Sequence, residues 1–190
     1  MPDMQKLRNS YYRVDYESPI GGITLCSDGN SLCGLWMEGQ KYFGDTIPGS
    51  MMADDGTAAA VLDEAKAWLD EYFAGSRPAI GRLPLAPIGS RFRQEVWRLL
   101  AEIPYGQVTT YGEIGRAVAR RLGKKSMASL AVGGAVGHNP ISIIIPCHRV
   151  VGADGSLTGF SGGLDKKVWL LEHEGVDVSR LYRPKKGTAL

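Results

Sequence analysis

The segment Pro146-Cys147-His148-Arg149-Val150 places one thiol directly beside two basic side chains. A cysteine attacks as its thiolate, so a reactive cysteine needs a base or a positive environment close by. Pro146 cannot continue a strand ladder, and a kink there would let the imidazole of His148 turn toward the sulfur. The segment therefore predicts nucleophilic chemistry at Cys147, with His148 as its base.

A histidine base also needs an acceptor that orients the ring. The carboxylates of Glu113, Glu172 and Glu174 are candidates, and their spacing does not choose among them.

The other two cysteines, Cys26 and Cys33, lack the spacing of a zinc pair, and the odd total of three cysteines argues against a disulfide framework. We predict buried thiols at both positions, no metal site and no cofactor.

The charge distribution divides the chain. Residues 1–90 hold 7 basic and 12 acidic side chains, a net charge of −5, whereas residues 91–190 hold 15 and 8, a net charge of +7. The segment 76–89 is rich in proline and glycine, which is typical of a linker. We predict an N-terminal domain over 1–89 and a C-terminal domain over 90–190 that meets a polyanion.

The N-terminal part predicts an antiparallel sheet with one helix. Strands are expected over Tyr11–Tyr16, Ile23–Cys26 and Leu32–Met37, separated by turn residues. Met51–Gly56 is predicted to be a loop. The apolar residues of Ala58–Phe73 repeat with a helical period, and Gly75 ends the helix. The fold class is therefore α+β.

The C-terminal part predicts a mainly helical domain, with helices over Ser90–Ala101, Thr110–Arg121 and Leu164–Glu174. Thr110 and Glu113 have the spacing of a capping box. The apolar run Ile141–Ile145 predicts a buried strand, and short parallel strands are expected at the active site.

A further helix is expected over Met127–Val136, with Ser126 as its cap. Together with the helix before it, this would form a helix-turn-helix. Its small side chains would allow close approach to another helix or to a DNA groove. The basic residues that could grip phosphates are Arg116, Arg120, Arg121, Lys124 and Lys125.

Seven short motifs follow one another between residues 103 and 175. They are Ile103–Val108, Thr110–Gly112, Ala131–Ala135, Gly137–Pro140, Ile144–Val150, Leu157–Leu164 and Trp169–Gly175. In this order and spacing they resemble the O6-alkylguanine-DNA alkyltransferase family. The first 75 residues resemble the variable N-terminal domain of that family more loosely.

The resemblance implies a role for each matched position. Cys147 would accept the alkyl group, His148 would act as its base through a water, and Glu174 would orient His148. Asn139 would brace the site, and Tyr111 would help to push out the target base and to protonate the leaving guanine. The implied base pocket consists of Tyr111, Val150, Phe160 and Ser161, where Phe160 replaces a tyrosine that is common in the family. The implied DNA contacts are Lys124, Lys125, Ala128, Ser129, Leu130, Ala131 and Gly133.

The implied reaction is direct-reversal repair of double-stranded DNA. The damaged base would rotate out of the duplex into a cavity with an ionised sulfur at its floor. That sulfur would take the alkyl group from O6-alkylguanine, and also from O4-alkylthymine, once and irreversibly, with no cofactor. One departure is Leu130, which stands where the family usually has the arginine that fills the vacated space. Either Leu130 acts as an apolar wedge or a cation from the longer turn before it takes the place of the arginine, and our hypothesis is the wedge.

Three other functions remain open from the residues alone: a non-catalytic binder of alkyl lesions, a helix-turn-helix transcriptional regulator and a cysteine hydrolase. A hydrolase would need an oxyanion hole, for which the sequence holds no sign.

The N-terminus lacks the apolar core of a secretory signal, and no apolar run reaches membrane-spanning length. We expect a cytoplasmic monomer that can bind DNA cooperatively and does not bind membranes.

Overall fold

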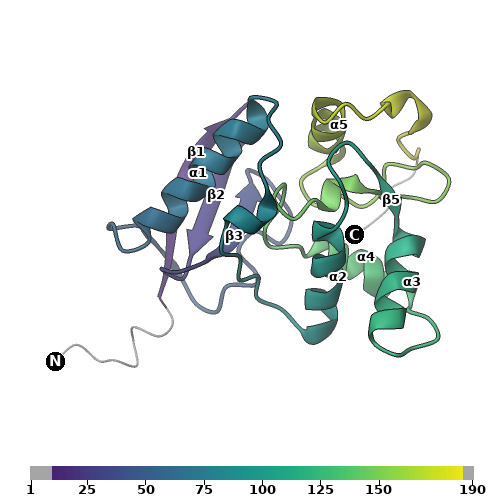
Figure 1. Cartoon of the computed structure of the whole chain (residues 1–190), viewed down its shortest axis with the longest axis horizontal. Helices are drawn as coiled ribbons and strands as arrows, with labels where there is room; N and C mark the ends of the chain where they lie inside the picture. The colour runs from purple at the N-terminus through teal and green to yellow at the C-terminus, as the bar shows by residue number, and fades with distance from the viewer. Residues whose placement is uncertain (1–9, 186–190) are drawn as a thin grey trace.

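The computed structural model describes residues 10–185. The β-sheet and helix α1 (Ala59–Phe73) form one side of the molecule, and helices α2 to α5 form the other (Figure 1). One continuous apolar core runs through both sides, because Leu62 and Trp68 of α1 belong to the same buried cluster as Trp97 and Leu170. The predicted α+β class is confirmed.

The sheet has the strand order β3-β2-β1-β4. Strands β1 (Tyr11–Ser18), β2 (Gly21–Ser27) and β3 (Leu32–Met37) are antiparallel neighbours, as the short turns between them predicted. Strand β4 (Met51–Ala53) pairs parallel with β1, so the prediction that Met51–Gly56 is entirely loop was wrong. Three residues are too few to show alternation, and this strand depends on the edge of β1 for its backbone partners.

Helix α1 covers the sheet and ends where predicted, at Gly75, whose φ of 89° favours glycine. Its buried face carries Leu62, Ala65, Trp68, Leu69 and Tyr72. A short 3₁₀ helix, Ile80–Arg82, lies in the segment that leads to the second half of the chain.

Three further helices form where the sequence predicts them. Helix α2 (Arg91–Ala101) is capped by Ser90, and α5 spans Leu164–His173. Helix α3 (Tyr111–Arg121) begins with a complete capping box, in which the Thr110 hydroxyl accepts from the Glu113 amide and the Glu113 carboxylate accepts from the Thr110 amide. These helices form as predicted because their caps and periods are local features.

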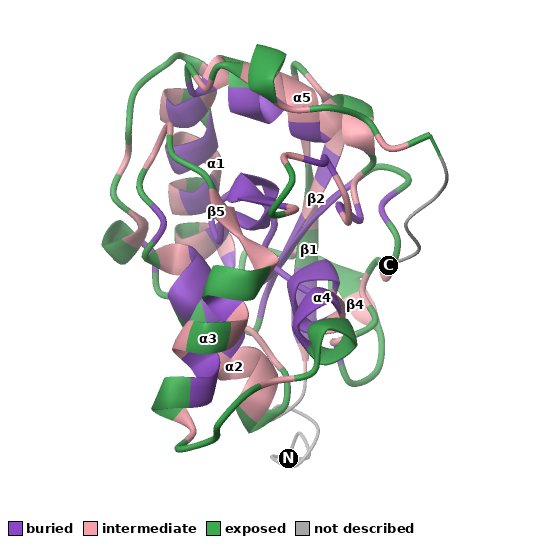
Figure 2. Ribbon diagram, turned by 90° about the vertical axis from the view of Figure 1, so that its right-hand side faces the viewer, coloured by how far each residue is buried: buried purple, intermediate pink, exposed green. Residues whose placement is uncertain are grey.

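Helix α4 (Ser129–Gly137) begins later than expected. Ala128, not Ser126, occupies its N-cap position, and no side chain caps it there. Figure 2 shows that the first turn of α4 is exposed, while most of the rest is buried.

The run Ile141–Ile145 is buried, but it is not a strand, which corrects the prediction. Ile143 has a φ of 71°, so the backbone turns inside the run, and only Ile141 forms a bridge, to Leu35 of β3. Strands β5 (Thr109–Thr110) and β6 (Val150–Val151) provide the expected short parallel pair. The 3₁₀ helices Cys147–Arg149 and Val178–Arg180 complete the fold. Within residues 10–185, the helices are too short or too polar to cross a membrane.

Trp97 links α2 to α4, because its buried indole donates a 2.8 Å hydrogen bond to the carbonyl of Ala135. We expect Trp97→Ala to lower the free energy of unfolding by about 3–5 kcal/mol, since it leaves a large cavity and an unpaired carbonyl. Urea titration would measure this. Val108→Ala, at an exposed position, should change stability by less than about 0.5 kcal/mol. Equal stability of the two variants would contradict the anchoring role.

Candidate active site

Cys147 lies at the start of the 3₁₀ helix that follows Pro146. Pro146 has φ −82° and ψ 66°, so the chain does bend at this point, and the Cys147 amide donates to the Ile145 carbonyl at 2.8 Å. Val150 directly follows this 3₁₀ helix and pairs with Thr109. This pairing joins the segment of Cys147 to the start of α3. Only 2% of Cys147 is exposed.

The sulfur lies among polar groups of the preceding loop. Asn139 spans that loop: its Nδ2 donates to the Ile145 carbonyl at 2.7 Å, and its Oδ1 accepts from the Ile141 amide at 3.1 Å. Burial raises the pKa of the Cys147 thiol, and bonds from Asn139 and the charge of Lys167 offset this only in part. The expectation of an ionised sulfur in an open cavity is therefore not met in this conformation, because burial of the thiol disfavours its charged form.

His148 is fully buried, and its Nε2 lies 2.7 Å from Oε1 of Glu174. An ionised carboxylate can only accept, so Nε2 carries the proton and Nδ1 holds the free lone pair. Within residues 10–185, Nδ1 has no hydrogen-bond partner. Burial lowers the pKa of His148 more than Glu174 raises it, so the imidazole is neutral and Nδ1 can accept a proton.

Glu174 is the buried carboxylate around which this site is organised. Its Oε1 accepts from His148, from Arg149 Nη2 at 2.9 Å and from the Tyr72 hydroxyl at 2.8 Å. Its Oε2 accepts from Arg149 Nε at 2.7 Å and from the Gly106 amide at 3.2 Å. Burial by itself would raise the pKa of Glu174, but the bonds from His148 and Arg149 outweigh it and hold the pKa well below its usual range.

Of the three glutamates that spacing left open, only Glu174 contacts His148. Glu113 is committed to the capping box of α3, and Glu172 is exposed on α5. The helical period alone cannot show this, because the contact joins residues that are 26 positions apart.

The residues expected to line a base pocket lie in the loop 158–163 and around it. Val150, Phe160 and Ser161 are buried, and the Tyr111 hydroxyl donates to the carbonyls of Thr158 at 2.9 Å and Gly159 at 3.2 Å. The phenol of Tyr111 stays protonated, because burial and the nearby Cys147 raise its pKa. The residue expected to handle the base therefore holds this loop in place.

Sequence reasoning missed Lys167, a lysine of α5 with no exposed surface. Its Nζ donates to the carbonyls of Val150 at 2.5 Å and Thr158 at 2.8 Å. Burial lowers its pKa to about 8, and Cys147 opposes that shift. The signal was present in the sequence, since Lys167 stands three residues before the buried Leu170 on the same helical face.

The predicted DNA-binding residues fall on one surface, with one exception. Lys124, Lys125, Ala128, Ser129, Leu130 and Ala131 are all exposed. Leu130 is 91% exposed, an unusual position for a large apolar side chain. Gly133 is buried, which corrects its assignment to this surface, because the helical period turns it toward the core.

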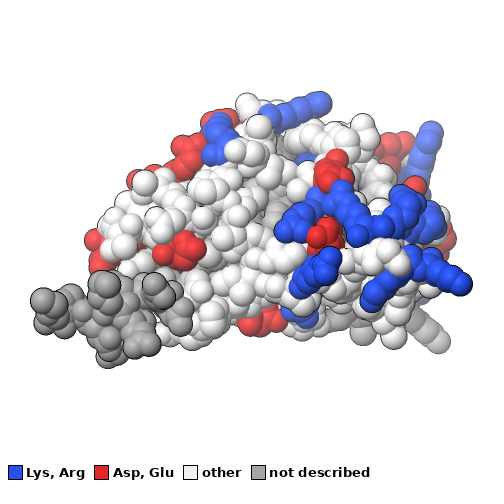
Figure 3. All heavy atoms as spheres, turned by 60° about the horizontal axis from the view of Figure 1, so that its bottom comes forward, with Lys and Arg blue, Asp and Glu red and all other residues white. Residues whose placement is uncertain are grey.

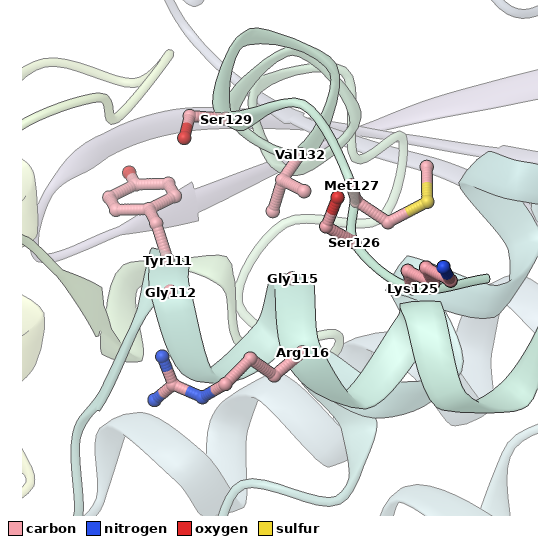
Figure 4. A pocket seen from close by; sticks show the side chains of 9 residues that line it. All are labelled: Tyr111, Gly112, Gly115, Arg116, Lys125, Ser126, Met127, Ser129 and Val132. Carbon is pink, nitrogen blue, oxygen red and sulfur yellow. The ribbon is translucent and has the colours of Figure 1, made fainter.

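Figure 3 shows Lys and Arg side chains gathered over the half of the molecule that carries α2 to α4. A groove separates α3 from the segment that enters α4, and Arg116 and Lys125 are among its lining residues. Figure 4 shows Tyr111 and Ser129 on facing sides of this groove, so it leads from the basic surface toward the residue that holds the 158–163 loop.

Among residues 10–185, His, Cys, Asp and Glu side chains form no group of three or more that could hold a metal ion. Cys26 and Cys33 are buried free thiols, and burial raises the pKa of each to about 12. They are consistent with a structural role in the core beside β2 and β3.

Comparison with known proteins matches most of the described chain to two domains of one methyltransferase family. Residues 91–176 match the family model described as 6-O-methylguanine DNA methyltransferase, DNA binding domain. Residues 10–87 match the model described as the ribonuclease-like domain of the same methyltransferase.

Similar individual proteins carry one common description. A methylated-DNA–protein-cysteine methyltransferase of Methanosarcina acetivorans is 44% identical over 87% of this chain and 98% of its own. One from Haemophilus influenzae is 39% identical, with 87% of each chain covered. The crystal structure of Mycobacterium tuberculosis OGT in complex with DNA is similar with a TM-score of 0.68 and 40% identity, over 90% of this chain and 94% of that one.

The depressed pKa of Glu174 predicts a pH dependence of stability. An unfolded glutamate titrates near about 4.3, so the stabilisation is complete above that pH and is lost as the pH falls through the lower folded value. We expect Glu174→Gln to lower the free energy of unfolding by roughly 3–5 kcal/mol at neutral pH, because Arg149 is left without its countercharge.

Urea unfolding between neutral and acidic pH would measure both quantities. The Glu174→Gln variant should lose less stability than the unaltered protein below about pH 5. Glu172→Gln, at an exposed position on the same helix, serves as the matched control. An unchanged acid slope in Glu174→Gln would show that the buried carboxylate does not have the assigned effect.

Proposed function

The chain belongs to the 6-O-methylguanine DNA methyltransferase family, and we propose that it repairs double-stranded DNA by moving an alkyl group from guanine O6 onto its own Cys147. The observation that carries the proposal is a buried thiol followed directly in the chain by a buried, neutral imidazole whose Nδ1 is free. A base that is neutral and desolvated can take the thiol proton when the substrate arrives. Relatives named as methylated-DNA–protein-cysteine methyltransferases support the same chemistry.

The reaction is a single displacement. The Cys147 proton passes to Nδ1 of His148, and Glu174 stabilises the imidazolium that results. The sulfur then forms a bond to the alkyl carbon while the carbon–O6 bond breaks and its electron pair stays on the guanine. The guanine takes up one proton, and the Tyr111 phenol can relay it by giving its own proton to the guanine and regaining one from solvent. O4-alkylthymine presents an equivalent carbon–oxygen bond and would react in the same way.

The product explains why each molecule would act once. An S-alkylcysteine is a thioether, and a thiolate is a poor leaving group from an alkyl carbon, so the product is stable in water. Transfer is therefore stoichiometric, and repair consumes the protein.

Substrate entry requires the 158–163 loop to move. Cys147 is buried in this conformation, and the loop contains Phe160 and Ser161 of the implied base pocket, so we expect the bonds from Tyr111 to the loop carbonyls to break when an everted base enters. Tyr111 also begins α3 beside the groove that opens on the basic surface. DNA contact and loop release would therefore occur at the same residue.

The exposed first turn of α4 is the surface that we assign to the minor groove. Ser129 and Ala131 are small enough for close approach, and Lys124 and Lys125 lie exposed just before them. The relative crystallised in complex with DNA supports binding of DNA by this fold. Leu130 would occupy the space left by the flipped base.

The first test incubates the protein with a duplex that carries one O6-methylguanine. We expect one methyl group per protein, located on Cys147 by mass spectrometry of its peptides, and no transfer by Cys147→Ser. Cys33→Ser is the matched control, because that thiol is also buried but lies away from His148. Binding without an adduct would indicate a non-catalytic lesion binder, and turnover beyond one equivalent would rule out a single-use mechanism.

The second test concerns the wedge. Leu130→Ala should lower the transfer rate on duplex DNA by roughly tenfold, because the vacated stack is no longer filled and unstacking costs a few kcal/mol. A fluorescent base analogue beside the lesion would report flipping directly. Met52→Ala removes an exposed apolar side chain from β4, in the N-terminal sheet, and should have no effect on transfer. If Leu130→Ala flips and repairs at the original rate, another residue fills the space.

A further inference from the structure

Tyr72 reaches the active site from helix α1, in the half of the chain that holds none of the residues assigned to transfer. Its side chain is 1% exposed, and its hydroxyl donates to Oε1 of Glu174 at 2.8 Å across 102 positions of sequence. Within residues 10–185, Tyr72 is the only residue of the sheet or of α1 whose side chain bonds to Glu174.

The position of this phenol is fixed by its neighbours. Its ring stacks on Trp68, with centroids 5.6 Å apart and planes 11° apart, and meets Tyr105 edge-on at 6.2 Å. Its backbone carbonyl lies 2.7 Å from Nε2 of His173, the last residue of α5. Two attachments, one through the hydroxyl and one through the backbone, therefore join α1 to the end of α5 where Glu174 stands.

The hydroxyl acts on the same oxygen that accepts from His148. Because Oε1 takes bonds from Tyr72, His148 and Arg149, its negative charge is shared among three donors. The phenol cannot serve as a base, since burial and the Glu174 charge raise its pKa far above neutrality. The phenol can only donate, and its one bond to Oε1 reduces the negative charge of Glu174 that acts on His148.

We propose that Tyr72 is a positioning residue of the transfer reaction, which holds the Glu174 carboxylate in place and limits how strongly it favours the protonated form of His148. This rests on the proposed function, in which His148 takes the Cys147 proton. A phenol that merely satisfies its own buried hydroxyl would leave the titration of His148 unchanged, whereas a positioning residue would not.

The direction of the effect follows from the charges. The groups that act on His148 are Glu174, Arg149 and Lys167, and Cys147 precedes it in the chain. Without the Tyr72 hydroxyl, more of the Glu174 charge faces His148, so the imidazolium is stabilised and the pKa of His148 rises. Less His148 is then neutral at a given pH, and the limb of the rate profile that requires the neutral base moves to higher pH.

The experiment is Tyr72→Phe in the full chain, which keeps the ring contacts and removes only the hydroxyl. Transfer from an O6-methylguanine duplex is measured across pH together with duplex affinity. We expect the acid limb of the rate profile to move to higher pH, with the rate of the unaltered protein recovered above that limb and with unchanged affinity. Tyr16→Phe is the matched control, because it removes a phenol–carboxylate bond of 2.6 Å to Asp70 of the same helix, away from Glu174.

A second measurement tests the proposal even if Tyr72→Phe folds poorly. Incorporating 3-fluorotyrosine at position 72 makes the phenol a stronger donor with almost no change of shape, and should move the His148 titration, followed by NMR of the labelled imidazole, to lower pH. An identical His148 titration and rate profile in both altered proteins would overturn the proposal. Failure of the unaltered protein to methylate Cys147 would instead overturn the proposed function, and the two results are distinguishable.

Discussion

The constraint on which the active site depends is a single carboxylate without exposed surface. Glu174 must keep its charge inside the protein, which is costly unless hydrogen bonds and a countercharge surround it. The structure supplies five bonds, from α1, from the loop after α2 and from the 3₁₀ helix that carries Cys147. These donors come from distant parts of the chain, so the charge is stable only when the two sides of the molecule are packed together.

The protonation states of the site follow from that arrangement. The ionised Glu174 fixes the tautomer of His148, and burial keeps the imidazole neutral and the Cys147 thiol protonated. The resting site therefore holds a weak nucleophile beside a base that is ready to accept its proton. Such a site suits a protein whose thiol reacts once, because a permanently ionised cysteine would be open to oxidation and to other electrophiles.

The surface and the interior of α4 serve different needs. Its later turns pack Val132 and Val136 into the core, while its first turn leaves Leu130 exposed next to a basic segment. Exposing the apolar side chain of Leu130 to water costs free energy, and contact with the unstacked bases of a DNA duplex would offset that cost. Tyr111 connects this surface to the covered thiol through its bonds to the 158–163 loop.

The sequence by itself determined the features that depend on neighbouring residues. The capping box at Thr110, the helix end at Gly75, the first three strands with their short turns and the adjacent Cys147 and His148 are local patterns, and all were predictable. Tertiary structure alone decided that Ile141–Ile145 turns instead of extending, that β4 joins the sheet and that Lys167 is buried. It also brought Tyr72 to Glu174. These outcomes depend on contacts between residues far apart in the chain, where burial and the satisfaction of buried polar groups outweigh local preference.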